Sequence, residues 1–119
     1  MPDRTELQEA ISDLVRVDVS WDGGVPVRGA LIQDGLALLA KIPDDCLPDR
    51  VCYAFDTLSF LWDTSRESLF VEVEFKGDGT FDVFCDHEIL MYLDGFSSAL
   101  GLPDRIIDAI RNNEVRTYE

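Results

Sequence analysis

The chain has 119 residues, of which 24 are Asp or Glu and 10 are Lys or Arg, so its formal net charge is -14. This length fits a single domain, residues 1–119, and a hydrophobic fraction of 46% supplies a core, which excludes a multidomain protein and a wholly disordered chain. We expect a cytoplasmic protein without a membrane partner, because no apolar run approaches the ~18 residues of a membrane span and the first residues do not resemble a secretory signal.

The N-terminal third of the sequence has the pattern of two helices joined by an extended segment. Thr5-Glu6-Leu7-Gln8 has the form of a capping box, and apolar residues then recur at helical spacing, which predicts a helix from Thr5. Alternating valines predict a strand over 15–21, and Asp22-Gly23-Gly24 predicts a loop after it. Leucines and isoleucines over 30–41 predict a buried helix, which Pro43 ends.

The rest of the sequence predicts an antiparallel sheet followed by a helix. Strand-like runs occupy residues 51–55, 59–62, 69–75 and 80–85. Gly77-Asp78-Gly79 predicts a tight hairpin turn between the last two runs. The apolar stretch 89–93 is either a fifth strand or an extended tail, and Leu102-Pro103-Asp104 opens a terminal helix. The expected fold class is α+β, a small four- to five-stranded antiparallel meander with helices packed on one face.

Acidic residues alternate with core residues along two of these runs. Side chains of a strand alternate between the faces of a sheet, so the valines of 69–75 and 80–85 point to the core and the acidic residues point away. One open surface would then collect four carboxylates and a ring, namely Glu72, Glu74, Asp82, Asp86 and Phe84. Such a cluster repels itself unless solvent or a basic partner covers it, which makes it a candidate binding face. General solubility or a salt-rich habitat is the alternative, and it predicts carboxylates scattered evenly.

One short pattern could carry metal-dependent catalysis. Pro48-Asp49 upstream of Glu74-Phe75-Lys76 is similar to the Pro-Asp and (Asp/Glu)-x-Lys pattern of metal-dependent nucleases. In that mechanism Asp49 and Glu74 would hold a divalent cation, and Lys76 would stabilise the developing charge. The pattern is short and common, and a net charge of -14 would repel a polyanionic substrate. We therefore expect no catalytic residue, metal or cofactor, and keep a metal-dependent hydrolase as an alternative.

The single histidine and the three cysteines form no recognisable site in the sequence. Cys85-Asp86-His87-Glu88 would alternate between the faces of a strand and could not close one tetrahedral metal site. Cys46, Cys52 and Cys85 are odd in number and have no C-x-x-C spacing, so we expect buried thiols. The basic residues form no patch, which disfavours direct binding of nucleic acid.

The order of turn residues and tryptophans resembles a group of small uncharacterised bacterial and phage-borne proteins. The resemblance covers about residues 21–85 and rests on Trp21-Asp22-Gly23-Gly24, Ile42-Pro43, Leu47-Pro48, Trp62, the run 69–75 and Gly77-Asp78-Gly79. The chain departs from the group at Gly24-Val25, where an aromatic glycine pair is usual. Those proteins are found beside toxin–antitoxin or mobile-element genes, so the resemblance implies a helix-plus-sheet interaction module without established catalytic residues.

Together these patterns favour an acidic inhibitor or accessory protein that covers a basic surface of a nucleic-acid-handling partner. Such a protein would be of the immunity, antitoxin, anti-restriction or anti-CRISPR type, and it could act by mimicking nucleic acid. Phe84 would add an apolar anchor to the four sheet carboxylates. Asp44, Asp45 and Asp49 would form a flanking acidic loop. A third interpretation is a structural subunit of a homo-oligomer, with Phe70 and Phe84 as an exposed seam.

Overall fold

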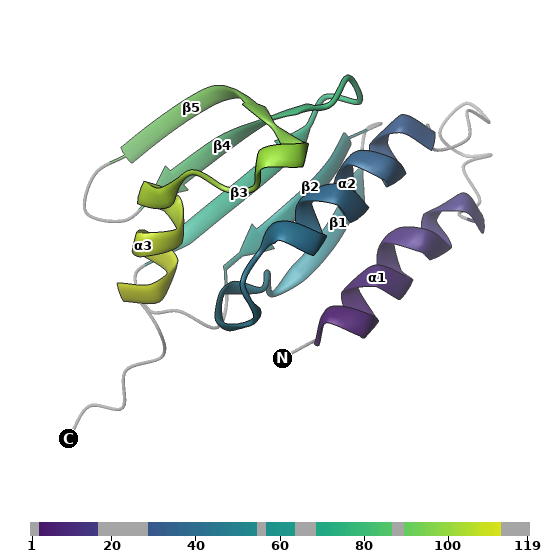
Figure 1. Cartoon of the computed structure of the whole chain (residues 1–119), viewed down its shortest axis with the longest axis horizontal. Coiled ribbons are helices and arrows are strands. Elements are labelled where there is room, and N and C mark those ends of the chain that lie inside the picture. The colour runs from purple at the N-terminus through teal and green to yellow at the C-terminus, as the bar shows by residue number, and fades with distance from the viewer. Residues whose placement is uncertain (1–2, 17–28, 55–56, 64–68, 87–89, 113–119) are drawn as a thin grey trace.

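A five-stranded antiparallel sheet, covered on one face by three helices, forms the body of the protein (Figure 1). The computed structural model describes residues 3–16, 29–54, 57–63, 69–86 and 90–112. Strands adjacent in sequence are adjacent in the sheet, whose order is β1-β2-β3-β4-β5. The predicted α+β meander is therefore confirmed.

The strands begin and end close to the predicted runs. They are β1 (Arg50–Ala54), β2 (Thr57–Trp62), β3 (Phe70–Phe75), β4 (Thr80–Asp86) and β5 (Leu90–Ser97). The hairpin between β3 and β4 closes where Phe75 pairs with Phe81. Gly77 and Gly79 adopt φ angles of 84° and 89° in this turn, a region that glycine occupies without steric cost. The ambiguous stretch after residue 88 is thus a strand, and it continues past the predicted end to Ser97.

Helix α1 (Arg4–Ser12) begins earlier than predicted, because its cap is Asp3 and not Thr5. An Asp3 carboxylate oxygen accepts a hydrogen bond from the backbone N–H of Glu6 at 2.8 Å, and the Glu6 carboxylate accepts one from the N–H of Asp3 at 3.2 Å. After α1, the short helix η1 (Asp13–Arg16) includes the first two residues of the predicted strand 15–21, so that prediction is wrong there. Its remaining residues and the predicted loop 22–24 lie outside the described residues.

Helices α2 (Gly29–Lys41) and α3 (Asp104–Asn112) pack with α1 on the same face of the sheet (Figure 1). Two short helices connect them to the strands, η3 (Asp44–Cys46) before β1 and η4 (Ser98–Leu100) after β5. Helix α2 approaches β2 closely, since a Cβ atom added at Gly35 would lie 2.9 Å from Cδ2 of Leu58.

The core lies between these helices and the sheet. Its largest fully buried side chains include Trp62 and Phe60 of β2 and Phe81 of β4. The indole N–H of Trp62 donates a hydrogen bond of 2.9 Å to the carbonyl oxygen of Cys46, which ties η3 to the sheet. Because one face of the sheet is used for this core, the opposite face is left for other contacts.

Candidate protein-binding face

The face of the sheet opposite the helices carries the predicted cluster. The register pairs Glu72 with Phe84 and Glu74 with Asp82, and directly paired residues point to the same side of a sheet. The alternating burial of β3 places its valines in the core, so these side chains point away from it. We call this side the outer face and define it by Arg50, Cys52, Ser59, Leu61, Phe70, Glu72, Glu74, Asp82, Phe84 and Asp86. None of the described helices packs on it (Figure 1).

Apolar side chains surround one carboxylate of the outer face, Glu72. Glu72 lies between Leu61 of β2 and Phe84 of β4, its direct partners in the two ladders. Phe84 also contacts Phe70 edge to face, with ring centroids 5.9 Å apart and an interplanar angle of 66°. Leu61 is only 7% exposed, although it does not belong to the cluster of core residues on the helix side. Glu72 therefore projects from a patch of apolar side chains.

The basic side chains described on this side already have carboxylate partners. Arg50 forms an ion pair with Asp63, with Nη2 at 2.7 Å and Nε at 3.0 Å from the same oxygen. Lys76, which follows β3, pairs with Asp82 at 2.8 Å. Three carboxylates of the outer face have no ion pair or hydrogen bond within the described part of the chain: Glu72, Glu74 and Asp86.

Asp82 is not an exposed carboxylate, which corrects its predicted place in the binding cluster. Its side chain is only 8% exposed. One oxygen pairs with Lys76, and the other accepts a hydrogen bond of 3.3 Å from the backbone N–H of Gly95. This second contact arises at the irregularity of the β4–β5 register between Phe81 and Val83. Asp82 therefore fastens the hairpin to β5 instead of facing a partner.

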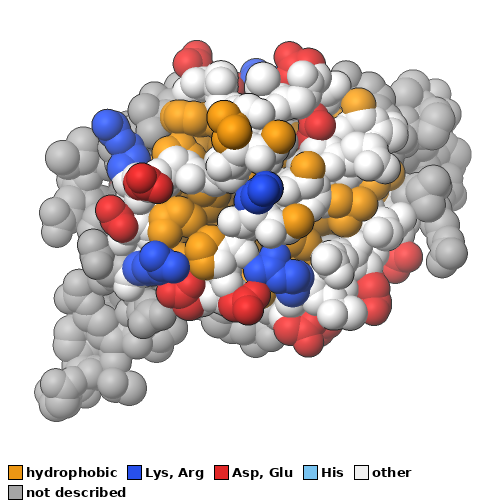
Figure 2. Space-filling model, viewed as in Figure 1, with side chains coloured by type: hydrophobic (Ala, Val, Ile, Leu, Met, Phe, Trp, Pro, Cys, Tyr) orange, Lys and Arg blue, Asp and Glu red, His pale blue; other side chains and the backbone are white. Residues whose placement is uncertain are grey.

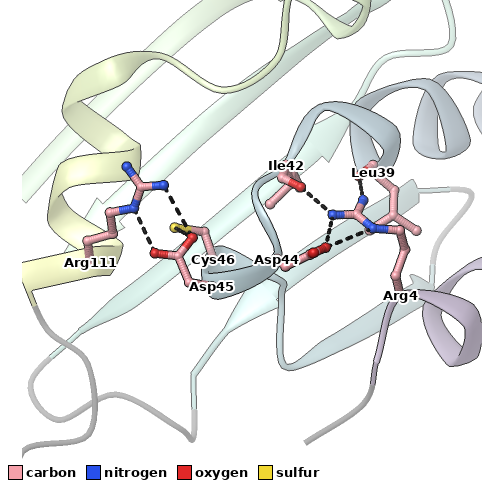
Figure 3. Close-up of polar contacts among 7 residues, drawn as sticks. All are labelled: Arg4, Leu39, Ile42, Asp44, Asp45, Cys46 and Arg111. Carbon is pink, nitrogen blue, oxygen red and sulfur yellow. Dashed lines mark hydrogen bonds and ion pairs between the residues drawn. The ribbon is translucent and has the colours of Figure 1, made fainter.

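The predicted acidic loop is engaged within the protein (Figure 3). Arg4 of α1 pairs with Asp44 at 2.7 Å and donates hydrogen bonds to the carbonyl oxygens of Leu39 and Ile42. Arg111 of α3 pairs with Asp45 at 2.8 Å. These contacts place both carboxylates on the helix side, where they link the first and last helices to one turn. The prediction that Asp44 and Asp45 flank the binding face is therefore corrected, because both are paired with arginines of the helices.

Electrostatics agree with this structural role of the loop. Hydrogen bonding and charge attraction from Arg111 hold the pKa of Asp45 below its ordinary value of 3.8. Asp49, the third acid of the loop, donates its backbone N–H to the carbonyl oxygen of Leu61 at 2.8 Å. Its carboxylate accepts the backbone N–H of Asp63 at 2.8 Å. Asp49 thus fixes the start of β1 against the end of β2.

The residues of the alternative hydrolase site are not brought together. Asp49 lies before β1, whereas Glu74 lies two strands away and further along the sheet. Standard strand spacings place the Cα atoms of the two residues about 14 Å apart. Lys76 is paired with Asp82. Among the described residues, no group of three His, Cys, Asp or Glu side chains is arranged to hold a metal ion. His87 and Glu88 lie outside the described residues.

The cysteines are thiols in two different environments. Cys46 and Cys85 are buried, as predicted, and burial raises the pKa of the Cys85 thiol. Cys52 is only half-buried, because it lies on the outer face, directly opposite Ser59. The sequence does not reveal this difference, since the alternation of β1 alone does not show which of its faces meets the core.

Charge on the helix side is mixed. Figure 2 shows acidic and basic side chains interspersed over this side of the molecule. Lys41 and Arg105 are exposed on this side and have no carboxylate partner among the described residues. The acids Asp104 and Asp108 are also exposed here and have no cationic partner among those residues. Carboxylates are therefore not confined to the outer face. What distinguishes the outer face is that its described bases are paired, and that two of its unpaired acids, Glu72 and Asp86, are paired across the hairpin with the aromatic residues Phe84 and Phe70.

No protein-family model, curated protein or solved structure matches this chain. Among the described residues, no helix is both long and apolar enough to cross a membrane.

Proposed function

We propose that this protein is an acidic binding module whose outer face covers a basic surface on a partner protein. One observation carries the proposal: Glu72, Glu74 and Asp86 have no cation partner in the described part of the chain, while Arg50 and Lys76 are paired with other acids. The face thus has a local excess of negative charge around a half-buried aromatic pair. Charge complementarity around an apolar centre is typical of specific protein interfaces.

The favoured partner is a protein that handles nucleic acid. Such proteins present Lys and Arg side chains to phosphate groups, so they offer the basic surface that this face would attract. Glu72 and Glu74 are two residues apart on β3, a rise of about 6.7 Å, which falls within the few-ångström to ~7 Å spacing of phosphates along a nucleic acid. In this role the module would act in the cytoplasm as an immunity, antitoxin, anti-restriction or anti-CRISPR protein.

The test is a binding experiment with two matched triple variants. The first, Glu72→Gln with Glu74→Gln and Asp86→Asn, neutralises the outer face. The second, Glu9→Gln with Asp104→Asn and Asp108→Asn, removes the same charge from the helix side. A partner copurified with the tagged chain from its native host is purified, and its affinity for each variant is measured at low and moderate salt concentrations.

We expect the affinity of the wild-type protein to fall with salt, and the outer-face variant to bind at least roughly tenfold more weakly with a smaller dependence on salt. The helix-side variant should retain most of its affinity. Equal losses in the two variants would mean that net charge alone governs binding, and no loss in either would remove the outer face from consideration.

A further inference from the structure

We propose that the outer face selects arginine over lysine in its partner, with one guanidinium group paired to Glu72 and stacked on the Phe70–Phe84 pair. This inference rests on the proposed function, because it specifies the chemistry of the basic surface that the face covers. It follows from the surroundings of Glu72, which differ from those of the other unpaired carboxylates.

Asp86 is also paired with two apolar residues, Phe70 and Leu90, but it is exposed at the end of β4. Glu72 is half-buried in the middle of β3 and has apolar neighbours on both adjacent strands. Leu61 and Phe84 are its direct partners, and side chains paired in this way have Cβ atoms about 5 Å apart. Glu74 instead faces Ser59 and the Asp82 carboxylate, which already holds a lysine. A cation that reached Glu72 would therefore be partly removed from water. An ion pair in such a position is stronger than one on an open surface.

The aromatic pair offers a ring face to such a cation. In an edge-to-face contact, one ring presents its edge to the other, so both faces of that first ring are left uncovered by its partner. Phe70 and Phe84 have this arrangement at 5.9 Å, and both rings are partly exposed. Because Phe84 is directly paired with Glu72, a planar group could lie on a ring while its edge meets the carboxylate.

Arginine fits this combination better than lysine. Its guanidinium group is planar, weakly hydrated and able to bind a carboxylate with two parallel N–H donors while stacking on an aromatic ring. The lysine ammonium group is a strongly hydrated point charge and loses more solvation in the same place.

Among the described residues, the arginine in the same row of the sheet as Glu72 is held elsewhere. Arg50 lies in the same row across the sheet, since it pairs with Leu61, which in turn pairs with Glu72. Its guanidinium group makes two contacts with Asp63, at 2.7 and 3.0 Å, and none with Glu72. No arginine of the described residues is therefore paired with Glu72, which leaves this carboxylate for an arginine from a partner, while Glu74 and Asp86 add long-range attraction.

Two synthetic nine-residue peptides test the proposal, one with four arginines and one with four lysines at the same positions. Their dissociation constants are measured by calorimetry at low salt with the wild-type protein, Glu72→Gln, Phe84→Leu and the helix-side control Asp108→Asn. We expect the arginine peptide to bind wild type about three to ten times more tightly than the lysine peptide. Phe84→Leu should remove most of this preference, Glu72→Gln should weaken the arginine peptide more than the lysine peptide, and Asp108→Asn should preserve the preference.

The outcomes separate this inference from the proposed function. Equal affinities for the two peptides, both weakened by Glu72→Gln, would overturn the preference for arginine and leave the acidic binding module intact. Binding of the arginine peptide that Glu72→Gln does not change would overturn the pairing with Glu72, and binding of neither peptide would overturn the proposed function itself. Thermal unfolding of each variant checks that its fold is retained, and Phe70→Leu repeats the test on the other ring if Phe84→Leu does not fold.

Discussion

The unpaired carboxylates of the outer face should make the isolated protein less stable than it could be. Glu72 has two such neighbours, Glu74 on the same strand and Asp86 diagonally across the hairpin. Replacing Glu72 by Gln keeps the size and polarity of the side chain and removes both repulsions. We therefore predict that Glu72→Gln stabilises the free protein, although the same change weakens binding.

The separations in the sheet give the size of this effect. Glu74 is about 6.7 Å along β3 from Glu72, and a diagonal neighbour such as Asp86 is about 8 Å away. In water each pair then repels by about 0.5 to 0.6 kcal/mol at low salt, and a Debye length of about 8 Å reduces this to roughly half or less at physiological salt. The variant should gain about 1 kcal/mol at low salt and about 0.5 kcal/mol at physiological salt, or about 4 and 2 °C in Tm.

Thermal and urea unfolding, followed by circular dichroism at several salt concentrations, measure this gain. Asp108→Asn is the matched control, because it also removes one negative charge, but Asp108 lies three residues from both Arg105 and Arg111 on α3. It should give no gain in stability. A Glu72→Gln variant that is less stable than wild type, or whose gain does not shrink with salt, would refute the reasoning, because Glu72 would then be making favourable contacts.

Three further predictions concern the helix side and the thiols. Trp62→Phe should lower the free energy of unfolding by about 2 to 3 kcal/mol, because it opens space in the core and leaves the Cys46 carbonyl without its indole donor. Urea unfolding measures this loss, and a value below about 0.5 kcal/mol would contradict the prediction. Iodoacetamide should label Cys52 in the native protein well before Cys46 and Cys85, as followed by peptide mass spectrometry, and equal rates would show that the assigned burial is wrong. Asp45→Asn should reduce stability at pH 7, because the lowered pKa of Asp45 means that its ion pair stabilises the fold above the unfolded pKa of 3.8. This stabilisation is lost as the pH falls through the lower folded pKa, so a difference from wild type that does not shrink as the pH falls below 3.8 would contradict the role of this pair.

The sheet could be predicted from the sequence because its signals are local. The alternation in 69–75 and the Gly77-Asp78-Gly79 turn determine the hairpin register, and a register error of one residue would turn every core side chain outward. The start of α1 has two candidate caps in the sequence, since both Asp3 and Thr5 precede a suitable capping partner by three residues. Asp3 caps the helix, and Thr5 lies within its first turn.

The sequence placed Glu72, Glu74, Phe84 and Asp86 together, but it could not reveal which acids are already paired. Asp82 is buried because of a lysine beyond the end of β3 and a backbone irregularity in the next ladder, neither of which alternation encodes. The loop acids were misplaced for a related reason. Their partners, Arg4 and Arg111, lie 40 and 66 residues away in sequence, so tertiary structure alone brings them to this turn.

Mapping the contact surface by nuclear magnetic resonance tests the central claim most directly. Titrating the isotope-labelled protein with the arginine peptide reports on each backbone amide separately. We predict that the largest shifts occur on β3 and β4 around Glu72 and Phe84, with little change on α2 and α3. Shifts centred on the helices, or no shifts at millimolar peptide, would contradict the assignment of the outer face as the binding surface.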